Sequence, residues 1–169
     1  MQNQPGFLVV LFWLIIGLAS VYALQRWRAN ATPKAQWTAD RTILELSFEG
    51  ERVIMKELMH GATHDVIKID AHIHHLGVAA EYEWMRRRHR GSIKVEQSLR
   101  AINVAKSGER VVFFDALVIR QRNGTTKELY FDISSFFGDG YSSPQVVADS
   151  PMVEQIRDLY ESVGRISAA

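Results

Sequence analysis

The chain has 169 residues, a length that suits one domain of ordinary size with short appendages. Its 20 Lys and Arg residues nearly balance its 19 Asp and Glu residues, so no net positive field favours nucleic acid as a partner. The absence of cysteine excludes disulfides, zinc–thiolate sites and thiol nucleophiles.

The chain begins with an uncharged, apolar stretch. The first charged side chain is Arg26, and the residues from Phe7 to Leu24 would span roughly 27 Å as a helix, close to the roughly 30 Å of a bilayer's hydrocarbon core. Trp27 suits an interfacial aromatic belt. We therefore predict a short tail over residues 1–6 and a single transmembrane helix over residues 7–27. A cleaved signal peptide stays open as an alternative, although the tail lacks the basic side chain that such peptides carry.

The basic residues near this stretch predict its orientation in the membrane. Arg26, Arg28 and Lys34 follow the apolar residues directly, whereas residues 1–6 carry no charged side chain. The positive-inside rule then places the N-terminus outside and the remainder of the chain in the cytoplasm. A periplasmic domain stays open, because small bacterial proteins with one N-terminal span often export their domain.

The remainder divides into a tether and a soluble, mainly β domain. Residues 28–37 are polar and contain a proline, which predicts an extended linker, and residues 38–169 form the domain. Early in the domain, apolar and polar residues alternate on both sides of Gly50, which predicts two strands joined by a turn. The stretch DVIKIDAHIHH, from Asp65 to His75, alternates along its whole length and predicts a half-buried strand with one solvated face.

The stretch from residue 79 to residue 104 is ambiguous. Some of its apolar residues fall at helical spacing, which favours two helices broken at Gly91. The same residues also alternate with polar ones, which favours a hairpin with the sequence RHRGS, residues 88–92, at its tip. The hairpin is the favoured interpretation, and the helices stay open.

The chain ends in a helix with recognisable boundaries. Ser150 is placed to cap its N-terminus, Pro151 suits the first helical position, and Gly164 lies just past the expected end. An apolar stripe recurs at helical spacing between them. These signals predict an amphipathic helix over residues 150–163.

The elements together predict the fold class. Asn123 and Gly124 separate two β-branched and aromatic runs, which is the strongest short-range signal for a hairpin. We therefore predict five to seven antiparallel strands that form a bent sheet or open barrel, closed by the C-terminal amphipathic helix.

Imidazole and carboxylate side chains suggest a metal site. His60 and His64 are four residues apart and would align on a helical turn. His72 and His74 would share the solvated strand face. Such ligands suit a divalent transition metal, zinc, copper or nickel. The alternative is a solvated polar surface that holds no metal. The candidate ligands are His60, His64, Asp70, His72 and His74.

The sequence DAHIH, from Asp70 to His74, resembles the first-strand motif of the amidohydrolase family, in which two histidines on one strand face bind a divalent metal. That family folds as a (β/α)₈ barrel of roughly 250 residues and takes further ligands from later strands. This chain is too short for such a barrel and has only His89 after His75. The resemblance is therefore confined to the motif itself.

The run MRRRHR is the sharpest charge feature. Arg86, Arg87, Arg88 and Arg90 could bind phosphate through bidentate guanidinium contacts, so an anionic lipid headgroup or an acidic protein surface is the expected partner. The alternative is a solvated hairpin tip, charged to prevent association between strand edges.

The sequence contains no G-x-S-x-G elbow, phosphate-binding loop or dinucleotide fingerprint, so no enzymatic activity is expected. These observations favour a membrane-anchored, non-enzymatic binding or assembly module, an accessory subunit that contacts the bilayer and a membrane-associated protein partner and needs no cofactor. The alternative function is a membrane protein that binds or handles a transition metal through the histidine cluster.

Overall fold

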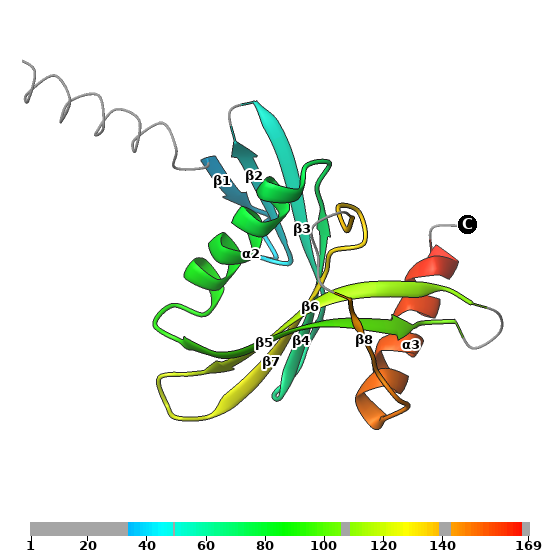
Figure 1. The fold of residues 1–169 in the computed structure, drawn as a ribbon. Coiled ribbons are helices and arrows are strands. Elements are labelled where there is room, and N and C mark those ends of the chain that lie inside the picture. The colour runs from blue at the N-terminus through cyan, green and yellow to red at the C-terminus, as the bar shows by residue number, and fades with distance from the viewer. Residues whose placement is uncertain (1–33, 49, 106–108, 139–142, 167–169) are drawn as a thin grey trace, which may run out of the picture.

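Alternating apolar and polar residues build one eight-stranded sheet, flanked by two helices, in this computed structural model (Figure 1). The structure describes residues 34–48, 50–105, 109–138 and 143–166. The elements are β1 (Lys34–Trp37), β2 (Ile43–Phe48), β3 (Glu51–His60), β4 (His64–Asp70), α2 (His74–Arg88), β5 (Ile93–Asn103), β6 (Val111–Arg120), β7 (Thr126–Asp132), β8 (Gln145–Val146) and α3 (Pro151–Ile166).

The strand order is β1-β2-β3-β4-β7-β6-β5-β8. The mainly β class with a C-terminal helix is confirmed, but the predicted strand set was wrong in two respects. The sheet has eight strands rather than five to seven, because β1 and β8 are too short to show a period in the sequence. It is also not purely antiparallel, since β4 pairs in parallel with β7 and β5 with β8.

The favoured hairpin over residues 79–104 was wrong, because this stretch contains most of α2 followed by β5. The buried residues of α2 recur at helical spacing, with Gly77, Ala80 and Trp84 on the side that faces the sheet. Glu81 and Glu83 are also buried, so the inward face is neither uniformly apolar nor clearly separated from the outward one. Because of this mixed composition, the sequence of α2 lacks the clear apolar stripe that predicts an amphipathic helix.

The two helices cover different parts of the sheet on opposite faces (Figure 1). Neighbouring residues of β4 illustrate the division: Ile67 packs in the cluster that contains Trp84 of α2, and Val66 packs in the cluster that contains Ile156 of α3. Successive side chains of a strand point to opposite faces, so a continuous apolar run serves both layers. The core is therefore two clusters with the sheet between them.

Strand β4 ends at Asp70, so the strand predicted through His75 was too long. The predicted alternation holds within β4, where Ile67 and Ile69 are buried and Lys68 is exposed. The chain then turns at residues 71–73 and enters α2. This change of direction explains why the histidines after Asp70 do not continue the strand face.

The start of the domain lies earlier than predicted. β1 occupies Lys34–Trp37, within the stretch expected to be a tether over residues 28–37. Residues 28–33 and the transmembrane helix predicted over residues 7–27 lie outside the described residues. None of the helices that the structure describes is long and apolar enough to span a membrane.

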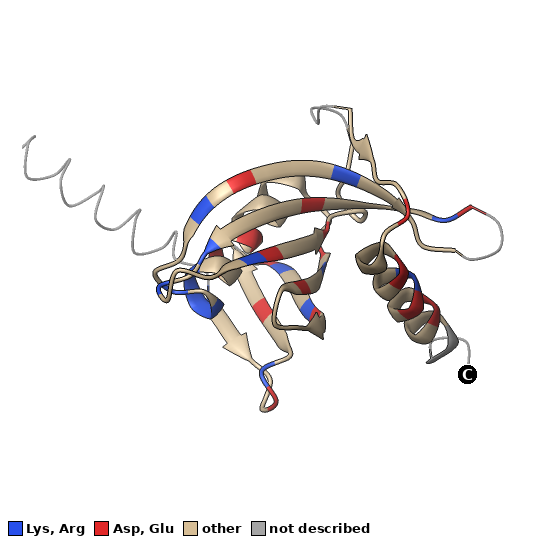
Figure 2. Ribbon diagram, turned by 90° about the horizontal axis from the view of Figure 1, so that it is seen from below, with Lys and Arg blue, Asp and Glu red and all other residues tan. Residues whose placement is uncertain are grey.

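The C-terminal helix was predicted correctly at its start. The Ser150 hydroxyl accepts the backbone N–H of Val153 at 3.3 Å, as an N-cap does. The helix runs to Ile166, beyond the predicted end at residue 163, and Gly164 lies inside it rather than past it. Figure 2 shows mainly acidic bands along α3, in contrast to the mixed signs on the strands.

One glycine sets how closely α2 approaches the chain after β7. A Cβ atom added at Gly77 would lie 2.4 Å from the ring of Phe136, a distance that no relaxed packing allows. Phe136 is itself buried in the core cluster beneath α2. The absence of a side chain at Gly77 thus lets the ring seat directly against the helix backbone.

We expect Gly77→Ala to lower the free energy of unfolding by about 1 to 2 kcal/mol, because overpacking against Phe136 outweighs the higher helix propensity of alanine. Chemical denaturation measures the change. Gly164→Ala is the matched control, since its Cβ would meet nothing closer than 3.8 Å and should cause no loss. The loss should shrink in a Phe136→Leu background, and an equal loss in both backgrounds would contradict this packing explanation.

Candidate functional site

The arginine run occupies the C-terminal end of α2 rather than the tip of a hairpin. Arg86, Arg87 and Arg88 form the last turn of the helix, and Arg90 follows it. Cations are favoured there because the unsatisfied carbonyl groups at a helix C-terminus carry partial negative charge. The four predicted contact residues are therefore brought together on one short segment.

These four arginines line an open groove together with Trp37 and Arg41. Trp37 is the last residue of β1, and its ring lies against that of Trp84, with centroids 5.1 Å apart, so the strand is tied to α2. Arg41 belongs to the turn between β1 and β2. Sequence reasoning missed both groove residues, because no local pattern marks them as neighbours of a distant helix end.

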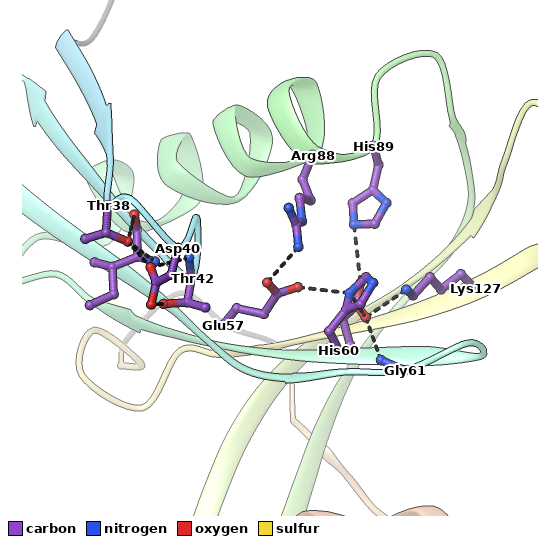
Figure 3. A network of polar contacts seen from close by, with 11 residues as sticks. Thr38, Asp40, Thr42, Glu57, His60, Gly61, Arg88, His89 and Lys127 are labelled. Atoms are coloured by element: carbon purple, nitrogen blue, oxygen red, sulfur yellow. Dashed lines mark hydrogen bonds and ion pairs between the residues drawn. The ribbon is translucent and has the colours of Figure 1, made fainter.

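The turn that carries Arg41 is organised by Asp40. This carboxylate accepts the backbone N–H of Thr42 at 3.1 Å and the hydroxyl groups of Thr38 and Thr42 at 2.6 and 2.8 Å (Figure 3). The same hydrogen bonds, that of the Thr38 hydroxyl foremost, hold the pKa of Asp40 below its usual value. Arg41 adopts a φ of 58°, the only positive value at a non-glycine residue in the described ranges. The surrounding turn thus holds a strained residue at the edge of the groove.

Two carboxylates neutralise part of the groove. Glu83 accepts two hydrogen bonds from Arg86, at 2.6 and 2.8 Å, and also pairs with Arg87. The Arg86 contact is the main reason why the pKa of Glu83 is lowered, so this carboxylate is ionised at neutral pH. Glu57 of β3 accepts a hydrogen bond from Arg88 at 2.9 Å.

The groove nevertheless keeps a surplus of positive charge. Within the described ranges, Arg41 and Arg90 have no ion pair, so five guanidinium groups face the carboxylates of Glu57 and Glu83. An anion that enters the groove would meet guanidinium groups whose N–H donors are not all used. This arrangement suits phosphate or carboxylate ligands.

A buried ion-pair network centred on Asp65 lies between this helix end and the sheet. Asp65 is fully buried. Its Oδ1 atom lies 2.8 Å from Lys127 Nζ and 2.9 Å from His60 Nδ1. The Gly61 N–H donates to the same oxygen at 3.2 Å. His89 Nε2 lies 3.5 Å from the other oxygen, so the groups converge from α2, β3 and β7 (Figure 3). Burial raises the pKa of Asp65, but the contacts with His89 and Lys127 outweigh it and hold the pKa below its usual value.

Strand alternation explains how two charged residues come to lie in the core. Asp65 is in phase with the buried Ile67 and Ile69 on β4, and Lys127 is in phase with the buried Leu129 on β7. Sequence reasoning missed this pair. The available signal was a charged residue on the apolar side of each strand, where an opposite partner is needed.

The structure brings only part of the predicted histidine cluster together. His60 ends β3 and His64 begins β4, so they flank a turn rather than sharing a helical turn, and His64 Nδ1 lies 3.0 Å from the Thr63 hydroxyl. Asp70 lies at the far end of β4, about 20 Å from His64 by the rise of a strand. The exposed His72 follows there, and His74, the first residue of α2, lies beyond it. The predicted ligands thus form two separate groups.

One alternative metal-binding group does occur in the described part of the chain. Single atoms of Glu57, His60 and Asp65 lie within 4.8 Å of one another. Their carboxylates already contact cations, since Arg88 pairs with Glu57 and Lys127 with Asp65. A metal ion would have to occupy a position next to the Lys127 ammonium group, so the arrangement favours an ion-pair network over a metal site.

Comparison with known proteins adds no functional assignment. No family model matches the chain, no curated protein is significantly similar in sequence, and no solved structure is significantly similar in fold.

We expect Lys127→Met to lower the free energy of unfolding by about 3 to 5 kcal/mol, because it leaves the Asp65 carboxylate buried without its nearest cation. Urea denaturation at pH 7 measures the loss. Lys68→Met, at an exposed position on β4, serves as the control and should change the value by less than about 0.5 kcal/mol. Similar losses in the two variants would show that the buried pair has no special role.

The lowered pKa of Asp65 predicts an acid-dependent loss of stability. A carboxyl group whose pKa is lower in the folded state stabilises the fold above its unfolded pKa, and this contribution is lost as the pH falls through the folded value. Stability should therefore decline as the pH falls below about 5, and Asp65→Asn should flatten that decline. Thermal unfolding as a function of pH tests this, with the exposed Asp70→Asn as control. An unchanged slope in Asp65→Asn would refute the assignment.

Proposed function

We propose that this chain is a membrane-anchored, non-enzymatic binding module whose arginine groove docks on an anionic surface beside the bilayer. The observation that supports this most directly is the position of the groove. Its wall includes Trp37, the last residue of the first strand after the predicted membrane span, together with the arginines of α2. The anchor and the basic surface therefore act at the same end of the domain.

The chain length between the predicted span and the sheet limits how far the groove can lie from the membrane. The predicted span ends at Trp27 and β1 begins at Lys34. Fully extended, the intervening residues 28–33 cover at most roughly 20 to 25 Å. A groove on β1 and the adjoining helix end would stay within tens of ångströms of the headgroups.

The chemistry of the groove fits phosphate headgroups. Each basic residue near an anionic membrane surface contributes roughly 1 kcal/mol, and a tryptophan beside them suits the interfacial region. The groove side chains are five arginines and one tryptophan, none of which is a nucleophile or a general base at neutral pH. Binding rather than catalysis is thus the function that this surface supports.

The accessory role in a membrane complex is part of the same proposal. A short anchor and a basic groove would place the domain against a membrane-associated partner, and an acidic protein surface would meet the same guanidinium groups as a lipid. Orientation favours the cytoplasmic leaflet, because Arg26, Arg28 and Lys34 follow the predicted span. That leaflet is the one rich in anionic lipid.

Docking can be measured with the full-length protein in nanodiscs. Because the chain has no cysteine, Ala39→Cys, in the exposed turn beside the groove, accepts a single fluorophore. We expect stronger energy transfer to a dye-labelled lipid when the nanodisc contains phosphatidylserine than when it contains phosphatidylcholine alone. Arg41→Glu with Arg90→Glu should lower the ratio of docked to undocked domain by roughly 30-fold or more, from about 1 kcal/mol for each arginine removed.

The control variant carries Lys68→Glu and Arg120→Glu, which change the same charge at exposed positions outside the groove. It should dock like the unmodified chain. Equal energy transfer with neutral and anionic lipid would contradict the lipid contact. A different outcome is that the unmodified chain does not dock on lipid but co-purifies with a membrane protein. If Arg41→Glu with Arg90→Glu abolishes that co-purification, the groove binds an acidic protein instead of lipid.

A further inference from the structure

A second concave site lies between α2 and the strands β5 and β6, lined by residues other than those of the arginine groove. It is a cavity of about 310 Å³, at the small end of the range for ligand pockets. Val78, Met85 and Leu117 supply an apolar wall, and the exposed Tyr82 stands at its edge. A partly open pocket of this size, with an apolar wall, would hold a ligand of a few carbon atoms.

Two buried carboxyl groups meet in this apolar cavity. Glu81 of α2 is 4% exposed and Asp115 of β6 is 7% exposed, and both line it. The two groups interact through a hydrogen bond, and Gln97 Nε2 donates to Asp115 Oδ2 at 2.5 Å. Two carboxyl groups this close share a proton, because two adjacent negative charges in a buried site repel each other.

The environment determines which group holds that proton. Burial, followed by the charge of Asp115, raises the pKa of Glu81 to about 9, and burial also raises the pKa of Asp115. Glu81 is thus protonated at neutral pH and donates to the Asp115 carboxylate. The Oε1 atom of Glu81 is buried and accepts no hydrogen bond from any residue that the structure describes.

The cavity therefore contains a buried acceptor, Glu81 Oε1, that receives no hydrogen bond from the described residues. One negative charge is buried at Asp115. The charge of the exposed Lys94 acts on both carboxyl groups, but its ammonium group donates to Gln97, at 2.7 Å, rather than to either of them. Burying an acceptor without a donor is unfavourable, and a bound donor would remove that cost. An ammonium group would supply both the donor and the counter-charge.

We propose that this cavity binds a small primary amine with an apolar body, whose ammonium group lies between Glu81 and Asp115 and whose hydrocarbon part lies against Val78, Met85 and Leu117. The proposal concerns different residues from those of the groove, so it stands independently of the docking function.

Binding of an amine should depend on pH, and the sign follows from the groups that line the cavity. The titratable ones are Glu81, Asp115, Lys94, His74 and Tyr82. As the pH rises from about 6 towards about 9, Glu81 loses its proton more readily, and the site gains negative charge while the amine is still protonated. Affinity should therefore rise across this range, and binding at pH 7 should release protons to the buffer.

The test uses three probes that share one apolar body: hexylamine, hexanol and hexanoate. Isothermal titration calorimetry of the full-length protein in detergent, corrected by titration into detergent alone, should show hexylamine binding at least 10-fold more tightly than hexanol and no binding of hexanoate. Titration in two buffers of different ionisation enthalpy measures the released protons.

Two variants separate the roles of the carboxyl groups. Asp115→Asn should weaken hexylamine at least 10-fold, because it removes the buried negative charge. Glu81→Gln should keep most of the affinity but abolish both the proton release and the rise with pH, because glutamine mimics the protonated acid and cannot ionise. Val78→Trp should block hexylamine and hexanol by filling the cavity.

Several results would overturn the proposal. The first is that hexanol or hexanoate binds as tightly as hexylamine or more tightly. The second is that Asp115→Asn leaves the affinity for hexylamine unchanged. The third is that hexylamine does not bind at millimolar concentration. If the variants fail to fold, the pH dependence of the unmodified protein still decides, since a flat or falling affinity between pH 6 and pH 9 contradicts the carboxyl pair as the binding group.

Discussion

The parallel pairing of β4 with β7 joins the two halves of the sheet, and the arrangement of everything else depends on it. Strands β1 to β4 lie on one side of this seam, and β5 to β8 lie on the other. Parallel pairing is slightly less stable per residue than antiparallel pairing. Asp65 and Lys127 bridge the seam from its two strands at 2.8 Å, in the core, where a charge pair is stable only if it is complete. His89 extends the bridge to the end of α2, so the seam also positions the helix that carries the arginines.

Helix α2 contributes to both proposed binding surfaces because its buried side includes two carboxyl groups, Glu81 and Glu83, beside its apolar residues. Glu83 faces the arginines at the helix end, and Glu81 faces the cavity over β5 and β6. A helix whose only role was packing would place apolar residues at both positions. Natural sequences break such local rules mainly where function requires it, which is why both proposals use this helix.

The sequence was sufficient where local chemistry determines structure. Asn123 and Gly124 form the predicted hairpin turn, and Ser150 caps the predicted helix, because both effects involve only neighbouring residues. The sequence did not predict α2, because its inward face combines Gly77 with Glu81 and no regular apolar spacing shows where the helix begins and ends. The groove was not predicted either, since Trp37 and the arginines meet only after β1 joins the sheet. His72 and His74 do not share a strand face as predicted, because the chain turns after Asp70, and no period in the sequence reveals that turn.

The edge position of β1 has a mechanical consequence. This strand has four residues and pairs only with β2, and its first residue, Lys34, lies opposite Ser47. Tension applied through the preceding chain would therefore act on this terminal pair before it reached Trp37 at the other end of the strand. Detachment of the whole strand would remove Trp37 from the wall of the groove, while the β4–β7 seam, separated from β1 by β2 and β3, could stay paired.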